Sequence, residues 1–215
     1  MRKFDEGEEY FDIDFDEEKV LASSGIIDDM FYIKDLKQRK LFLNNDIDQA
    51  SVWDVAKHIL QFNKEDIEID PEDRKPILLY VVSNGGEIDS GFELIDIIQS
   101  SKTPVYTINL GYQYSMGFLI GLAGHKRFAM SNAKYLMHDG SNYVYNSGAK
   151  AQDQMQFNKR VEERIKKYVM SRSKVTSKEY DSKLRVEWYL FADEAQEKGF
   201  VDYIIGKDCD IDDII

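Results

Sequence analysis

The sequence predicts an α/β fold in which parallel strands are joined by helical crossovers. A continuous apolar, β-rich run at 77–83, "ILLYVVS", leads through two glycines into a helical segment at 89–101. A second strand-like run at 104–110, "PVYTINL", leads through another glycine turn into a helix within 111–124. Strands that alternate with helices in this way are typical of βαβ units and a parallel sheet.

The elements before the first of these units follow from local patterns. Residues 39–48, "RKLFLNNDID", predict a short strand that ends in a polar turn. Residues 49–64 repeat apolar side chains at helical spacing and predict a helix, on which we expect His58 to be structural. Residues 65–76 are polar and contain two prolines, so they predict a connection before the strand at 77.

The later elements are predicted in the same way. The helix at 89–101 has Asp89 or Ser90 as its candidate N-cap, because short polar side chains accept hydrogen bonds from the first free backbone N–H groups. Further on, the patterns predict strands in "KRFAMSN" and "AKYLMHDG", a long charged helix at 149–173, a short helix in "ADEAQEKGF" that ends at Gly199, and a strand in "VDYII".

Composition excludes several classes of protein. A chain of 215 residues with 43% hydrophobic residues is long enough for one domain with a substantial core. Its net charge of −12 disfavours nonspecific binding to nucleic acid or to an anionic membrane. No stretch is apolar enough for a membrane span or a signal peptide, so we expect a cytoplasmic protein. The single cysteine, Cys209, excludes an internal disulfide, and three scattered histidines offer no zinc-binding spacing, so we expect no metal or cofactor.

Ser115 occupies a position suited to a nucleophile. In "GYQYSMG" it lies between a predicted buried strand and the next helix, beside unpaired backbone N–H groups and the positive end of the helix dipole. Gly86 occupies the matching turn of the other unit and has no Cβ, so its amide can approach a substrate and form an oxyanion hole with the Met116 amide. The alternative is that both are ordinary turns, with a serine that caps a helix.

A nucleophilic serine needs a base, and His138 is the candidate. It ends a predicted strand and is followed by Gly140, a position that can open onto a cleft. His125 is flanked by Lys126 and Arg127 and is expected at the surface. A lone histidine after a strand also has a structural interpretation, and these residues alone leave both open.

Four motifs, taken together and in this order, resemble the proteolytic subunit of the Clp protease, ClpP. They are "SNGGEIDSG" (83–91), "GYQYSMG" (111–117), "LMHDG" (136–140) and "FADEAQEKGFVD" (191–202). The resemblance implies a ClpP/crotonase-type fold of repeated β-β-α units with a parallel sheet and a long, protruding handle helix at 149–173. It also implies a serine endopeptidase that hydrolyses unfolded polypeptides, with Ser115 as nucleophile, His138 as general base, and the amides of Gly86 and Met116 as the oxyanion hole.

The acid of the implied triad departs from the pattern. Where the family has Arg-Asp-x-Phe-Leu-Ser-Ala, this chain has "VEWYLFA" at 186–192, which places Glu187 at the aspartate position. Glutamate carries the same charge, but its extra methylene must be absorbed by a shift of the backbone or of His138. Asp139 is the alternative partner, ranked second because adjacent residues on a strand point to opposite faces.

The resemblance further implies a homo-oligomer of heptameric rings, stacked as a tetradecamer around a chamber, and an AAA+ unfoldase that feeds it as the partner in ATP-dependent proteolysis. We expect three parts: an acidic N-terminal arm at 1–25, a ClpP-like peptidase domain at 26–207 and an acidic tail at 208–215. Two other functions stay open: a catalytically weak or inactive ClpP-like subunit with a structural or regulatory role, and a crotonase-type acyl-CoA enzyme. The crotonase reading requires no serine nucleophile, so the pair of Ser115 and His138 argues against it.

Overall fold

A computed structural model describes residues 26–140, 146–183 and 185–214. The predicted arm at 1–25 lies outside the described residues. The chain divides into two compact units, Met1–Gln38 and Arg39–Ile215. The described part of the first unit contains helix α2 (Ile26–Lys37), which the sequence patterns did not predict. The elements described below belong to the second unit.

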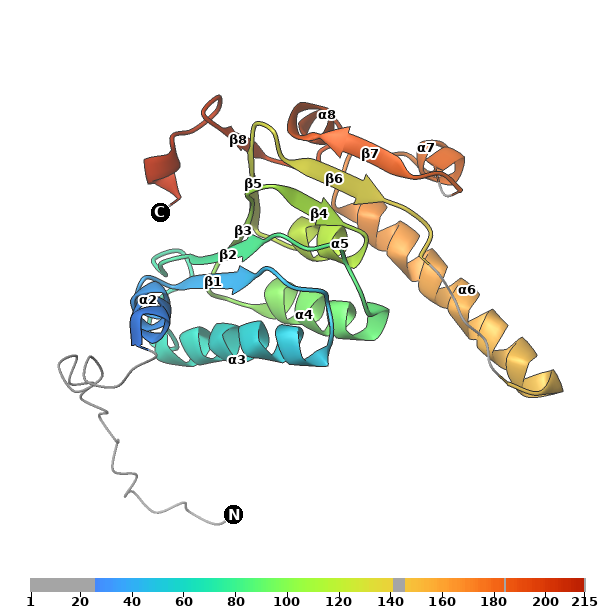
Figure 1. The fold of residues 1–215 in the computed structure, drawn as a ribbon, viewed down its shortest axis with the longest axis horizontal. Helices are drawn as coiled ribbons and strands as arrows, with labels where there is room; N and C mark the ends of the chain where they lie inside the picture. The colour runs from blue at the N-terminus through green and yellow to red at the C-terminus, as the bar shows by residue number, and fades with distance from the viewer. Residues whose placement is uncertain (1–25, 141–145, 184, 215) are drawn as a thin grey trace, which may run out of the picture. The chain divides into compact units, whose positions relative to one another are not determined.

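A parallel sheet forms the centre of the second unit (Figure 1). Its strand order is β1-β2-β3-β5-β8, and each neighbouring pair is parallel. This confirms the predicted α/β class, and the parallel five-stranded sheet is consistent with the ClpP/crotonase fold. The strands are β1 (Lys40–Leu43), β2 (Ile77–Val81), β3 (Val105–Asn109), β5 (Lys126–Met130) and β8 (Tyr203–Ile205).

A second, three-stranded sheet lies beside the first. It consists of β4 (Tyr112–Tyr114), β6 (Lys134–Met137) and β7 (Trp188–Phe191), with β4 parallel and β7 antiparallel to β6. A bridge between Ser83 and Gln113 links it to the chain that follows β2. The prediction for 111–124 was wrong at its start, because a strand and not a simple glycine turn precedes the helix. A three-residue strand is too short to show a reliable period in the sequence.

Helices α3 (Gln49–Glu65), α4 (Ile88–Ser100) and α5 (Met116–Leu122) form a packed layer beside the strands. The predicted N-cap of α4 was wrong: Glu87 holds that position, and the Ser90 hydroxyl donates to the Glu87 carboxylate at 2.7 Å. The remaining helices are α6 (Gly148–Ser171), α7 (Ser177–Lys183), α8 (Ala192–Glu197) and the 3-10 turn η1 (Ile211–Asp213). Helix α6 runs away from the strands (Figure 1), and Val169 is its one fully buried residue.

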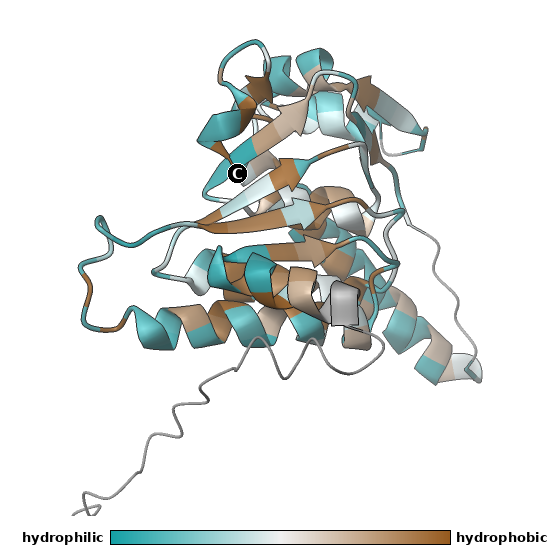
Figure 2. Cartoon of the chain, turned by 60° about the vertical axis from the view of Figure 1, so that its left-hand side comes forward, coloured by the Kyte–Doolittle hydropathy of each residue, from teal (hydrophilic) through white to brown (hydrophobic). Residues whose placement is uncertain are grey.

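The core lies on both faces of the five-stranded sheet, whose strands carry mostly apolar residues (Figure 2). All five residues of β2 are buried, as expected for a central parallel strand. One face packs against the helical layer. On the other face, Ile214 near the end of the chain is buried in an apolar cluster. Its other buried members are Leu78, Tyr80, Ile108, Phe128 and Ile205.

Candidate active site

The three-stranded sheet brings three predicted site residues together at one end of its strands. Ser115 directly follows β4, and His138 directly follows β6, whose direction is the same. Glu187 directly precedes β7, which runs in the opposite direction. The paired positions Met137 and Trp188 therefore place His138 and Glu187 at neighbouring positions just beyond the sheet.

The backbone of Ser115 has an unusual conformation that is fixed at both ends. Its φ of 53° and ψ of −121° lie outside the regions that non-glycine residues commonly adopt. Its N–H donates to the Leu136 carbonyl at 2.9 Å, and its carbonyl accepts from Phe118 at 3.1 Å. Ser115 is the N-cap of α5 by position, but its hydroxyl makes no capping hydrogen bond. Helix capping therefore does not explain this serine, and a strained residue at such a turn is typical of a functional site.

Two adjacent glycines form the turn after β2, and the first of them lies against Ser115. Gly85 has a φ of +104°, and a Cβ at this position would lie 2.6 Å from the Ser115 Cβ. Gly86 has a φ of +152°, and a Cβ there would lie 2.1 Å from the Ile47 carbonyl oxygen. Hydrogen bonds from Ile47 to Gly85 at 2.8 Å and from Glu87 to Ile47 at 2.7 Å fix this segment. Only glycine fits both positions, because they combine left-handed dihedrals with close contact to other backbone.

The two backbone amides predicted to form an oxyanion hole donate no described hydrogen bond. Among the hydrogen bonds of the described residues, neither the Gly86 N–H nor the Met116 N–H has an acceptor. Met116 begins α5, so its N–H is one of the free donors at a helix N-terminus. Both residues line a cavity together with Ser115 and His138. The cavity is thus lined by Ser115 and by two residues whose backbone N–H groups have no acceptor among the described hydrogen bonds.

His138 forms a hydrogen bond with Glu187. The His138 Nδ1 and the Glu187 Oε1 are 3.2 Å apart. Because a carboxylate only accepts, Nδ1 carries the hydrogen, which leaves Nε2 of a neutral ring as an acceptor. The second oxygen, Glu187 Oε2, accepts from the Tyr189 hydroxyl at 3.0 Å. These bonds, that from His138 foremost, hold the pKa of Glu187 below its usual value.

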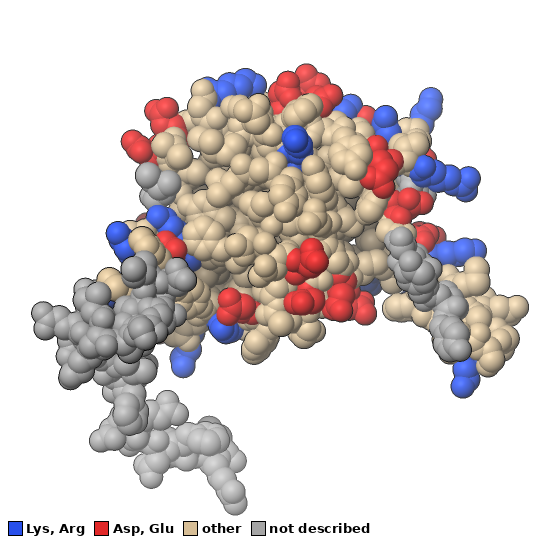
Figure 3. All heavy atoms as spheres, in the orientation of Figure 1, with Lys and Arg blue, Asp and Glu red and all other residues tan. Residues whose placement is uncertain are grey.

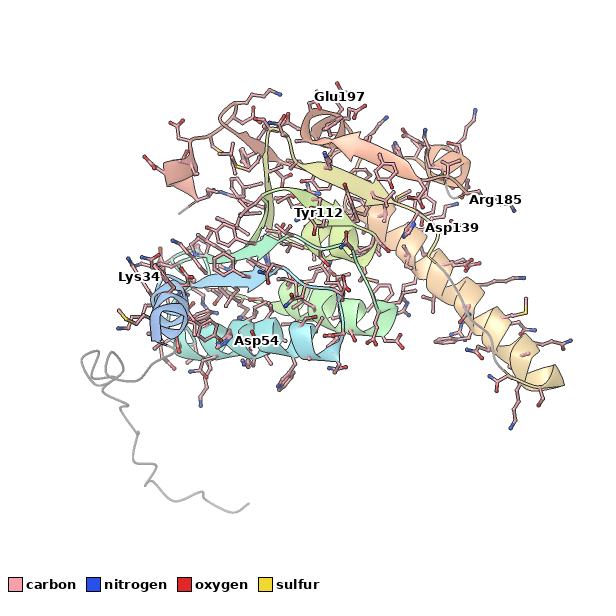
Figure 4. The ribbon with its side chains drawn as sticks, viewed as in Figure 1. Lys34, Asp54, Tyr112, Asp139, Arg185 and Glu197 are labelled. Atoms are coloured by element: carbon pink, nitrogen blue, oxygen red, sulfur yellow. The ribbon has the colours of Figure 1, made fainter. Side chains whose placement is uncertain are left out.

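Two other hydrogen bonds of His138, to Asp139 as the alternative acid and to Ser115 as the nucleophile, are not among those described. Asp139, the alternative acid, is exposed beyond the end of β6 (Figure 4), and no described hydrogen bond joins it to His138. The described hydrogen bonds also include none between the Ser115 hydroxyl and the His138 ring. His138 is about a quarter exposed, and the Glu187 side chain is 57% exposed. The pair is therefore open to solvent.

The cavity has a volume of about 280 Å³ and a mainly apolar wall. Ile165 from α6 and Tyr180 from α7 contribute to it. Helix α6 was predicted, but no local pattern indicated that Ile165 faces the site, and α7 itself was not predicted. Tyr180 is buried, which raises its pKa to about 12, so its hydroxyl stays neutral at physiological pH. The other lining residues are Gly86, Ile88, Ser115, Met116, Phe118, Leu119, Met137, His138 and Gly140.

The part of the chain that the structure describes has no candidate membrane span and no metal-binding cluster of three side chains. None of its helices is both long and apolar enough to cross a membrane. None of its His, Cys, Asp and Glu side chains gather in threes that could hold a metal ion.

The parallel sheet, the strained serine and the paired glycine turn together define an α/β protein of the ClpP/crotonase type. The Clp protease family model matches residues 26–208, and the chain belongs to this family. It is 28% identical over 197 residues to ATP-dependent Clp protease proteolytic subunit 2 of Treponema pallidum, covering 91% of this chain and 95% of the relative. It is 33% identical to proteolytic subunit 3 of Streptomyces coelicolor (82% and 79% covered) and 32% identical to proteolytic subunit 1 of Streptomyces avermitilis (83% and 80% covered).

Proposed function

We propose that this protein is a serine endopeptidase that cleaves unfolded polypeptides. The observation that carries the proposal is that Ser115, His138, Gly86 and Met116 line one cavity, and that the amides of the last two have no acceptor among the described hydrogen bonds. Membership of the Clp protease family supports it.

In the proposed reaction, the Ser115 Oγ attacks the carbonyl carbon of the scissile bond while His138 Nε2 accepts the hydroxyl proton. The Gly86 and Met116 amides donate to the oxyanion of the tetrahedral intermediate. His138 then gives its proton to the leaving amine, and the C–N bond breaks. Water repeats the sequence on the acyl-enzyme and releases the new carboxylate. Glu187 holds the Nδ1–H throughout and stabilises the charged ring.

The missing hydrogen bond between Ser115 and His138 is compatible with this role, because catalytic hydrogen bonds in a site without substrate are often long and tighten when substrate binds. Both residues line the same cavity, and the backbone of Ser115 is held by hydrogen bonds to Leu136 and Phe118. The absence of a described hydrogen bond between Ser115 and His138, together with the exposure of Glu187, favours one second candidate function. This candidate is a ClpP-like subunit that is catalytically weak or inactive and has a structural or regulatory role.

The cavity also suggests which substrates are cleaved. Met116, Phe118 and Leu119 of α5 line it, with Met137 and Ile165 from other elements. We expect cleavage after apolar residues in extended chains, with the peptide added as a strand beside the 83–86 segment. A cleavage profile dominated by basic residues before the scissile bond would contradict this assignment.

The proposal includes assembly and a partner. Helix α6 carries exposed apolar side chains at Met155 and Phe157, which a contact between subunits would cover. The named relatives are subunits of ATP-dependent proteases. We propose that this chain is likewise cytoplasmic, forms stacked heptameric rings and receives unfolded chains from an AAA+ unfoldase.

Labelling with a fluorophosphonate probe tests the proposal, because the probe reacts only with activated serines. Mass spectrometry should find the modification at Ser115, and Ser115→Ala should abolish both labelling and peptide cleavage. Ser131→Ala, which removes an exposed serine hydroxyl that donates to the Ile205 carbonyl, is the matched control and should label normally. A folded, assembled protein that does not label would favour the inactive subunit.

A further inference from the structure

Tyr189 lies directly beside the proposed catalytic acid. It is two residues after Glu187, and alternate residues of a strand point to the same face. The burial of β7 alternates accordingly: Trp188 and Leu190 are buried, whereas Tyr189 and Phe191 are exposed. The Tyr189 hydroxyl donates to Glu187 Oε2 at 3.0 Å, while Glu187 Oε1 bonds His138 at 3.2 Å. Each carboxylate oxygen thus has its own partner.

A glutamate at this position needs such a second contact. Its side chain has one more rotatable bond than aspartate, and this one is 57% exposed. Through one oxygen alone, the carboxylate plane can still turn about its terminal bond, which is a broad, weakly restrained torsion. Hydrogen bonds to both oxygens fix that plane. No group other than His138 and Tyr189 hydrogen-bonds the Glu187 side chain among the described residues.

The ring of Tyr189 is itself held in place. It packs edge-on against the Tyr114 ring, with centroids 6.0 Å apart and planes at 89°. Tyr114 contacts Tyr112 on the same strand at 5.1 Å. The register explains the contact, because Leu136 of β6 pairs with Tyr114 on one side and with Tyr189 on the other. Tyr112 is labelled in Figure 4, and the middle of the face that Figure 3 shows carries few charged side chains.

We propose that Tyr189 is a positioning residue whose hydroxyl holds the Glu187 carboxylate in the orientation that bonds the His138 Nδ1–H. The inference rests on the proposed function, since it assigns a supporting residue to the same site. Tyr114 directly precedes Ser115, so the contact between the Tyr189 and Tyr114 rings also connects Tyr189 to the strand that precedes the proposed nucleophile.

The protonation states agree with this role. The bonds from His138 and from Tyr189 both lower the pKa of Glu187. The bond to Glu187 raises the pKa of Tyr189. At neutral pH the acceptor is therefore a carboxylate and the donor keeps its proton, as the hydrogen bond requires.

Tyr189→Phe tests the inference because it removes the hydroxyl and keeps the ring. We expect kcat for an apolar peptide substrate to fall about three- to tenfold with KM within about twofold, since the lost bond acts on the base and not on substrate binding. Tyr112→Phe is the matched control: it removes the same hydroxyl from a neighbouring ring and should leave kcat unchanged. Equal kcat values in Tyr189→Phe and the parent protein would overturn the inference.

A double-mutant cycle shows whether Tyr189 acts through Glu187. Tyr189→Phe should slow fluorophosphonate labelling about three- to tenfold in the parent protein, but less than twofold in a Glu187→Gln background. A full three- to tenfold effect in that background would show that Tyr189 acts elsewhere and would overturn the inference.

Carboxyl ¹³C NMR of Glu187 separates this inference from the proposed function. Tyr189→Phe should raise the Glu187 pKa, and Tyr112→Phe should not. If the parent protein labels at Ser115 but Tyr189→Phe changes neither kcat nor this pKa, the inference fails alone. If the parent never labels, the proposed function fails, and the NMR titration still decides whether Tyr189 holds the carboxylate.

Discussion

Gly85→Ala tests whether the turn after β2 is built against the proposed nucleophile. An alanine Cβ would lie 2.6 Å from the Ser115 Cβ, 2.9 Å from the Tyr114 carbonyl oxygen and 3.0 Å from the Met116 nitrogen. Two of these atoms are backbone, so no flexible side-chain end can move aside. The turn would have to shift relative to the start of α5.

The expected loss of stability has two parts. A non-glycine residue in a left-handed conformation costs about 1–2 kcal/mol, and the φ of Gly85 is +104°. Forcing a methyl group into a filled site costs about 1–3 kcal/mol more. The sum, about 2–5 kcal/mol, corresponds to a fall in Tm of about 4–20 °C for a chain of this length.

Urea unfolding at fixed protein concentration, together with the rate of fluorophosphonate labelling, measures both consequences. Labelling should slow at least about tenfold, because displacement of Met116 moves a proposed oxyanion donor. Gly111→Ala is the control, since nothing lies within 4 Å of a Cβ there, and it should change stability by less than about 0.5 kcal/mol. A Gly85→Ala protein with the parent's unfolding midpoint and labelling rate would refute the reasoning.

Three further predictions concern the scaffold. Asp66 bonds Arg39 twice at 2.6 Å with a side chain only 2% exposed, and these bonds hold the pKa of Asp66 below its usual value. Asp66→Asn should therefore cost about 2–4 kcal/mol at pH 7. In urea titrations its difference from the parent should begin to shrink below about pH 4, where the unfolded carboxylate becomes protonated, and should be lost once the pH passes below the lowered pKa of folded Asp66; a difference independent of pH would contradict this. Arg127 bonds both oxygens of Asp202 and the carbonyls of Arg172 and Gly199, so Arg127→Lys should cost about 2–3 kcal/mol in the same assay, and an unchanged midpoint would mean that this network adds nothing. Ile214→Ala should cost about 2–5 kcal/mol because Ile214 is buried on the sheet, whereas Ile211→Ala, at a 52% exposed position, should cost almost nothing, and equal effects would show that Ile214 does not pack there.

The strands of the central sheet and the helices beside them were predictable because each has a pattern of apolar residues within its own sequence. Residues 77–81 are apolar throughout, and helix α3 (49–65) repeats its apolar residues at helical spacing. The second sheet was only partly predictable. β4 and β7 have three and four residues, and their identity depends on pairing with β6, which is remote in sequence. A short strand of this kind is decided by its neighbours and not by its own composition.

Some residues of the candidate site were likewise predicted from the sequence, and others were not. Ser115 and Gly86 stood out because a turn before a helix has known consequences for backbone donors. Tyr189 and Tyr180 did not stand out, since their roles depend on distances to other elements that no local pattern encodes. The prediction of the α4 N-cap was wrong for a related reason. Ser90 has the short polar side chain that is typical of an N-cap, but its hydroxyl donates to the Glu87 carboxylate within the first turn.

The geometry of the three-stranded sheet bears on how a glutamate can stand where the family pattern has an aspartate. The strand register alone places residues 138 and 187 side by side, so the distance between their backbones is set by sheet pairing and not by the acid. A longer side chain in a fixed gap must bend, and a bent, exposed side chain samples several orientations unless something selects one. The Tyr189 hydroxyl, two residues along the same face, is the group in position to do so. Under the proposed assignment of Glu187 as the acid, Glu187 and Tyr189 act as one unit, and a substitution at either should be interpreted together with the other.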